Sequence, residues 1–142
     1  MTQIDFYTHV EDKLKTACRL TGKAFGRGLR VVVYCPDTET LEHVDRLLWT
    51  TPPIGFVPHC TPANPLAVTT PVIVAADGTE LPHDEVLLNL RDEWPPFFSR
   101  FQRLVEIVSL EAGDRERARE RYRFYRDRGY EIRSHDLSKL GE

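Results

Sequence analysis

Residues 29–38 read Leu-Arg-Val-Val-Val-Tyr-Cys-Pro-Asp-Thr, and this stretch decides the fold class. The run Leu29–Cys35 is apolar except for Arg30, and such a run predicts a strand that is buried on both faces. Pro36-Asp37-Thr38 then predicts the start of a helix that continues to Trp49. A buried strand followed at once by a helix is the repeating unit of α/β domains.

The segments on both sides continue this alternation. On the N-terminal side, a strand is predicted at 4–7 and a helix at 10–25. On the C-terminal side, strands are predicted at 72–76, 85–90 and 104–110, and helices at 92–101 and 114–128. Six of the ten prolines lie between residues 52 and 71, which favours an extended connection with room for only a short strand near Phe56. We therefore predict a three-layer Rossmann-like α/β domain with a mostly parallel sheet.

Composition limits the size and the class of the protein. The 142 residues suit one domain over residues 1–142, and 41% hydrophobic residues exclude a disordered or fibrous chain. No apolar run is long enough for a membrane span, and the N-terminus lacks the features of a signal peptide, so we expect a cytoplasmic protein without a membrane partner. The net charge of −3 argues against general attraction to nucleic acid.

The usual signatures of catalysis and of cofactor binding are missing. No glycine follows the first strand, and the glycine cluster at residues 22–28 follows a helix, so a phosphate-binding loop is not predicted. Cys18, Cys35 and Cys60 show no CxxC spacing, and His59-Cys60 has no second pair at metal-ligand spacing. We expect no catalytic residue, no metal and no cofactor, and keep a nucleotide-dependent or thiol enzyme as the alternative.

A basic helix is predicted near the C-terminus, over Asp114–Arg128 within the segment 113–129, and Gly129 ends it. It carries seven arginines and four acids, a local charge of +3, so the rest of the chain carries −6. At about 100° per residue, one arc of the helix collects what we call the arginine stripe. It comprises Arg115, Arg119, Tyr122, Arg123 and Arg126, whereas Ala118 and Tyr125 face another side and could pack on the sheet.

Two interpretations of the stripe stay open on composition alone. Guanidinium groups beside an aromatic ring suit an acidic peptide or phosphates, because each guanidinium can bind an anion with two hydrogen bonds. The same residues also suit a solvated helix face, with pairs such as Glu116–Arg119 and Glu120–Arg123.

A second feature is the aromatic ridge, residues 48–59, in which Trp49 and Phe56 stand beside several prolines. On spacing alone, the two rings are favoured to close the core. Large rings on a rigid backbone also suit an anchor for a protein partner.

Three stretches of the chain resemble the chi subunit family of bacterial DNA polymerase III, a clamp-loader accessory protein. They are Asp5-Phe6-Tyr7, then Leu47-Leu48-Trp49 with Pro52 and Phe56-Val57-Pro58-His59, and finally residues 118–126 with Gly129. The last two are specific in combination, and together the three stretches span nearly the whole chain.

The resemblance implies a noncatalytic subunit of a DNA-directed DNA polymerase (a nucleotidyltransferase) and a Rossmann-like fold without a bound nucleotide. It implies that the basic helix binds the acidic C-terminal tail of single-stranded DNA-binding protein through the arginine stripe, with Val108 as a wall of the pocket. It also implies that Trp49, Phe56 and Pro58 hold the psi subunit of the clamp loader, or alternatively a repair helicase.

The chain departs from the family where arginine replaces the common lysine at 115 and 123, and the segments 61–71 and 134–142 match poorly. A third interpretation is direct binding of single-stranded DNA by Arg115–Arg128, which the −6 on the rest of the chain opposes.

Overall fold

One seven-stranded sheet organises the described part of the chain, which in this computed structural model comprises residues 1–50, 57–78 and 81–138. All pairs of neighbouring strands are parallel, and the strand order is β3-β4-β2-β5-β6-β1-β7. The strands are β1 (Gln3–Val10), β2 (Val31–Tyr34), β3 (His59–Cys60), β4 (Val72–Ala75), β5 (Val86–Asn89), β6 (Arg103–Ser109) and β7 (Ile132–Asp136). The prediction of an α/β domain with a mostly parallel sheet is confirmed.

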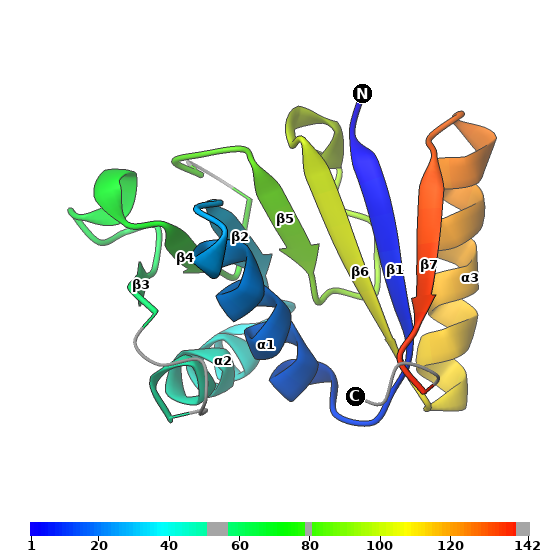
Figure 1. Cartoon of the computed structure of the whole chain (residues 1–142), viewed down its shortest axis with the longest axis horizontal. Helices are drawn as coiled ribbons and strands as arrows, with labels where there is room; N and C mark the ends of the chain where they lie inside the picture. The colour runs from blue at the N-terminus through cyan, green and yellow to red at the C-terminus, as the bar shows by residue number, and fades with distance from the viewer. Residues whose placement is uncertain (51–56, 79–80, 139–142) are drawn as a thin grey trace.

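Helices cover both faces of the sheet and give it three layers. The helices are α1 (Lys13–Gly26), α2 (Thr38–Thr50) and α3 (Ala112–Asp127), and the 3₁₀ turns are η1 (Ala67–Thr69) and η2 (Phe98–Arg100). Figure 1 shows α1 and α2 in front of the sheet and α3 beside β7 on its other side. None of the helices in the described ranges has the length and apolar character that crossing a bilayer requires.

The central strand β2 shows how the sequence separates the two cores. Successive side chains of a strand point to opposite faces of the sheet. Val31 and Val33 therefore pack with α1 and α2, and Val32 and Tyr34 pack in the core on the α3 side. All four side chains are buried, as the apolar run predicts.

The prediction of a helix at 92–101 is wrong, because only the turn η2 forms there. Pro95 and Pro96 lack amide hydrogens, and side chains from other elements bind the carbonyl groups of this segment. Arg121 Nη1 donates to the carbonyl oxygen of Asp92 at 2.7 Å, and Asn89 Nδ2 donates to that of Glu93 at 3.1 Å. The segment is therefore ordered by its contacts without being helical.

The strand β7 has no counterpart in the prediction. Its residues, Ile-Arg-Ser-His-Asp, contain one aliphatic side chain, so the apolar pattern of a buried strand is absent. The strand forms because it pairs along β1 at the edge of the sheet, from Ile4 opposite Ile132 to Thr8 opposite Asp136.

A buried ion pair fixes α3 on the sheet. Arg121 on α3 donates from Nε to Oε1 of Glu106 on β6 at 3.0 Å, and the two side chains are 1% and 0% exposed. The hydroxyl of Tyr125 donates to Glu106 Oε2 at 2.6 Å, and Asn89 Nδ2 donates to the same oxygen at 3.1 Å. Burial raises the pKa of the Glu106 carboxyl, and these donors oppose that rise.

Removing Arg121 should destabilise the fold far more than removing an arginine from the solvent side of α3. We expect Arg121→Met to lower the free energy of unfolding by about 3 kcal/mol, because Glu106 is then left buried without its partner. Arg123→Met, at an exposed position of the same helix, should change it by less than about 0.5 kcal/mol. Urea denaturation measures both values, and equal costs would contradict the role of the pair.

Candidate functional site

The arginines of α3 have different environments, although all seven look alike in composition. Arg121 is buried against Glu106. The Nε of Arg117 lies 3.1 Å from Oδ1 of Asp92, and the guanidinium of Arg128 lies 3.6 Å from the ring centre of Phe124. Structural contacts therefore occupy three of the seven arginines, and the other four are those of the stripe.

The arginine stripe is exposed and mostly without acidic partners. Among the residues that the structure describes, the pairs Glu116–Arg119 and Glu120–Arg123 do not form. In the stripe, only Arg126 has an ion-pair partner within the described ranges, Asp127 at 3.3 Å, and both side chains are largely exposed. The contacts do not support the interpretation of a helix face held by its own ion pairs.

A pocket of about 210 Å³ opens beside the first half of the stripe. We call it the α3 pocket. It lies between α3 and the carboxyl ends of β1 and β6, and its lining comprises Phe6, Thr8, His9, Val108, Ser109, Arg115, Ala118, Arg119 and Tyr122. The structure therefore brings Arg115, Arg119, Tyr122 and Val108 together in one site, while Arg123 and Arg126 lie further along the helix, outside this lining.

The floor of the α3 pocket is apolar. The ring of Tyr122 meets that of Phe6 edge to face, with 5.4 Å between their centres. Ala118 and Val108 are buried at the base, and the small side chain of Ala118 leaves the space between helix and strands open. A ligand with an apolar group and a negative charge would place the apolar group here and the charge on Arg115 and Arg119.

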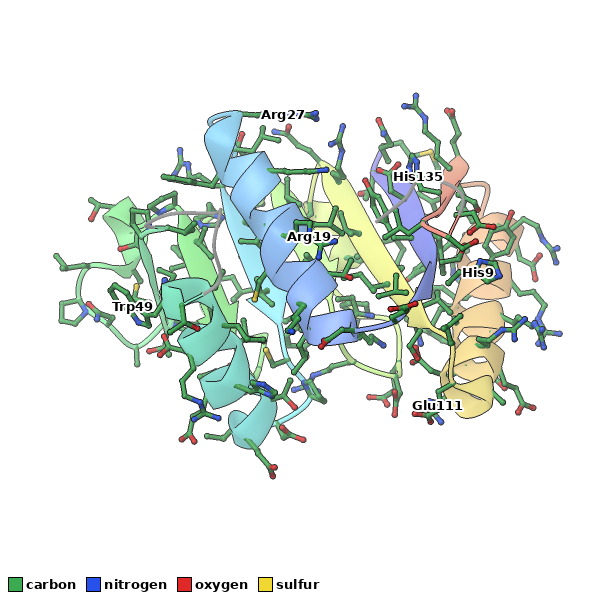
Figure 2. The ribbon with its side chains drawn as sticks, turned by 60° about the horizontal axis from the view of Figure 1, so that its bottom comes forward. His9, Arg19, Arg27, Trp49, Glu111 and His135 are labelled. Carbon is green, nitrogen blue, oxygen red and sulfur yellow. The ribbon has the colours of Figure 1, made fainter. Side chains whose placement is uncertain are left out.

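His9 is a lining residue that the sequence analysis did not single out. It has a φ of +59°, a left-handed conformation that is uncommon for residues other than glycine, at an irregularity in the pairing of β1 with β6. Its Nδ1 lies 3.1 Å from Oγ1 of Thr8 and 3.2 Å from Oδ1 of Asp136, at the end of β7. Figure 2 shows His9 beside α3, whose start is marked by Glu111.

Asp114 fixes the start of α3 next to the pocket. Its Oδ2 accepts a hydrogen bond from the amide of Ser109 at 2.8 Å, and its Oδ1 accepts one from Nζ of Lys13 at 3.0 Å. Burial raises the pKa of this carboxyl, but the Ser109 amide and Lys13 outweigh burial and hold the pKa below its usual value. The carboxylate therefore joins α3 to both β6 and α1.

The structure describes residues 48–50 and 57–59 of the aromatic ridge. Trp49 is 57% exposed at the end of α2, and its ring lies 4.9 Å from that of His59. Val57 is buried and Pro58 is partly exposed, whereas Phe56 lies outside the described residues. The core role that spacing favoured for Trp49 is therefore wrong, because the last turn of α2 leaves this ring at the surface.

His59 and Cys60 do not form a thiol site. Nε2 of His59 lies 3.0 Å from Oδ1 of Asp45 on α2, and Nδ1 lies 2.7 Å from the carbonyl oxygen of Val57. Cys60 is the next residue of β3 and packs with the core on the α3 side. The thiol and the imidazole therefore point to opposite faces of the sheet.

Comparisons with known proteins agree on one family. Residues 1–133 match the family model described as DNA polymerase III chi subunit, HolC. The chain is 33% identical over 144 residues to DNA polymerase III subunit chi of Pseudomonas aeruginosa, covering 99% of this chain and 100% of that protein. It is 28% identical over 132 residues to the subunit of the same name from Escherichia coli, covering 92% and 88% of the two chains. The corresponding Haemophilus influenzae protein is 27% identical over 122 residues, 85% of each chain.

The lowered pKa of Asp114 predicts a stability that depends on pH. The stabilisation from this carboxylate is present above its unfolded pKa of about 3.9 and is lost as the pH falls through the lower folded pKa. Asp114→Asn should therefore be less stable than the natural chain at neutral pH, and the two should converge in acid. Urea denaturation from pH 7 to pH 3 tests this, and a gap that does not change with pH would contradict it.

Proposed function

Because this chain belongs to the DNA polymerase III chi subunit family, we propose that it is a noncatalytic adaptor whose α3 pocket binds the acidic C-terminal tail of single-stranded DNA-binding protein. In this role the chain would link the clamp loader, and through it the polymerase, to single-stranded DNA that is already coated with that protein. Contact with nucleic acid would then be indirect.

The observation that carries the proposal is a pair of exposed guanidinium groups, without acidic partners among the described residues, on an apolar pocket. Arg115 and Arg119 line the α3 pocket, and neither forms an ion pair with a described residue. A volume of about 210 Å³ suits one large apolar side chain better than a nucleotide. An acidic peptide that ends in an apolar residue fits both features.

The aromatic ridge is proposed as the contact with the clamp loader, through the psi subunit or an equivalent, or with a repair helicase. The exposed ring of Trp49 supports this, because a ring that is 57% exposed can be buried by a partner. Pro58 is partly exposed and close in sequence, and Phe56 enters the proposal from the resemblance alone. The ridge and the α3 pocket lie on different elements, α2 with β3 and α3 with β1 and β6, so each could be occupied independently.

Substitutions in the stripe should affect tail binding in a graded way. We expect Arg119→Ala and Arg115→Ala each to weaken binding of the tail peptide by about 1.5 kcal/mol, because each removes a charge-assisted hydrogen bond at the pocket. Arg126→Ala should cost less, since Arg126 lies outside the lining and pairs with Asp127. Fluorescence anisotropy with a labelled peptide of the host tail measures the affinities.

The matched control is Arg46→Ala, which removes an exposed arginine from α2, away from the pocket. It should leave the affinity unchanged. Rising salt should lower the peptide affinity of the natural chain more than that of the Arg119→Ala variant, since fewer ionic contacts remain in the variant. Unchanged affinity in both pocket variants would rule out this site for the tail.

Trp49→Ala should weaken association with the clamp loader while leaving tail binding intact. The exposed ring contributes little to the core, so the variant should fold normally, and circular dichroism checks this. A drop of tenfold or more in affinity for reconstituted clamp loader is expected if the ring is an anchor. Val68→Ala, which shortens another exposed apolar side chain, on η1, is the control. Normal assembly by a folded Trp49→Ala protein would remove the ridge from the proposal.

A further inference from the structure

A larger cavity lies on the opposite face of the sheet from the α3 pocket. It has a volume of about 530 Å³ and runs between α1 and the strands β5, β6, β1 and β7. We call it the α1 groove. Figure 2 shows α1, carrying Arg19 and Arg27, on one side of β6 and β1, and His135 of β7 on the other side. The lining of this groove includes none of the residues of the arginine stripe and neither Trp49 nor Pro58.

Cationic side chains border the groove. Arg19 and Lys23 of α1, and Arg27 directly after its last residue, follow one another at intervals of four residues, which places them on one side of the helix at a spacing of about 6 Å. Arg103 approaches from the start of β6. Among the described residues, the lining of the groove includes no aspartate or glutamate, and neither Lys23 nor Arg27 forms an ion pair. This charge is concentrated on a protein whose net charge is −3.

A buried carboxylate positions the polar part of the groove. Asp5, whose side chain is 7% exposed, accepts a hydrogen bond from His135 Nε2 at 2.9 Å, and its Oδ2 lies 3.8 Å from Nε of Arg103. The ring of Tyr7 stacks on His135 with 4.6 Å between centres. Burial and the Asp5 carboxylate raise the pKa of Tyr7, and Arg103 and Arg27 oppose that rise, so both guanidinium groups act on the middle of the groove.

The rest of the lining is aliphatic. Val86, Leu88 and Val105 form the floor, and Leu20 and Leu137 contribute to the sides. Aliphatic surface bordered by cations suits an anionic ligand that also carries apolar groups. Apart from histidine, Tyr7 is the single aromatic side chain that the described part of the chain contributes to the lining, and it already stacks on His135, so these residues offer no platform for nucleic-acid bases.

The backbone around the groove argues against a phosphate group. Phosphate sites commonly use amide hydrogens at the start of a helix. Here α1 ends beside the groove, at Gly26 followed by Arg27, and a helix end presents carbonyl oxygens. Recognition must come from side chains spaced along α1. That arrangement fits several carboxylates along a chain.

From these features we propose that the α1 groove binds an extended acidic segment of a protein partner. Its carboxylates would contact Lys23, Arg27 and Arg103, and its aliphatic side chains would lie on Leu88 and Val105. This site is separate from the α3 pocket, because side chains of neighbouring residues on β1, Phe6 and Tyr7, face the pocket and the groove respectively.

The test uses the full chain with Arg119→Ala as background, so that the α3 pocket contributes little. The probe is a fluorescent peptide of alternating glutamate and leucine with an amidated C-terminus. We expect saturable binding that Lys23→Glu and Arg27→Glu each weaken at least fivefold. Arg46→Glu, which makes the same charge change at an exposed position on α2, should weaken it less than twofold. In NMR spectra, the amide chemical shifts of Leu20, Leu88 and Val105 should change when the peptide is added.

Three results would overturn the proposal. The first is no saturable binding of the peptide. The second is equal weakening by Arg46→Glu, which would show a general charge effect. The third is saturable binding of an oligo-dT strand that Lys23→Glu weakens more than it weakens the peptide, which would assign the groove to nucleic acid. None of these results depends on whether the tail of single-stranded DNA-binding protein binds the α3 pocket.

Discussion

The ion pair between Arg121 and Glu106 is the constraint on which the site depends. It buries a charge on each of α3 and β6, and such a pair is tolerated only where further donors satisfy the carboxylate, as Tyr125 and Asn89 do here. The pair also fixes the rotation of α3 about its own axis. With Ala118, Arg121 and Tyr125 turned to the sheet, a spacing of about 100° per residue brings Arg115, Arg119 and Tyr122 to the side that faces the ends of β1 and β6. The same ion pair that anchors the helix therefore decides which arginines remain available to a ligand.

The strands β1 and β7 direct side chains to both faces of the sheet. Because side chains alternate along a strand, Phe6 closes the α3 pocket while Asp5 and Tyr7 reach the other face. On β7, His135 points into the α1 groove, and its neighbour Asp136 lies against His9 of the α3 pocket. A short polar edge strand, which contributes little to the core, thus lines the α1 groove with His135 and contacts a lining residue of the α3 pocket through Asp136.

The apolar pattern was enough to predict the layers, the parallel sheet and the arginine stripe, because helix and strand periods are local properties. Helical spacing already left Arg121 out of the stripe, but it could not show that Arg121 is buried in an ion pair with Glu106, because all seven arginines look alike in composition. The signal lay in combining two elements. Arg121 shares a helix side with Ala118 and Tyr125, and Glu106 interrupts an otherwise apolar strand. The left-handed turn at His9 and the pairing of β7 with β1 depend on contacts between distant residues, and no local pattern encodes them.

The distribution of charge favours short-range recognition over attraction at a distance. A protein with net charge −3 has little long-range attraction for a polyanion such as DNA, whose binding grows with the number of phosphates contacted. Several of its cationic residues instead line a pocket of about 210 Å³ and a groove of about 530 Å³ with apolar floors. A ligand must therefore bring an apolar group to the floor to benefit from the nearby guanidiniums. Acidic peptides with aliphatic or aromatic side chains meet that condition, and a bare phosphodiester chain does not.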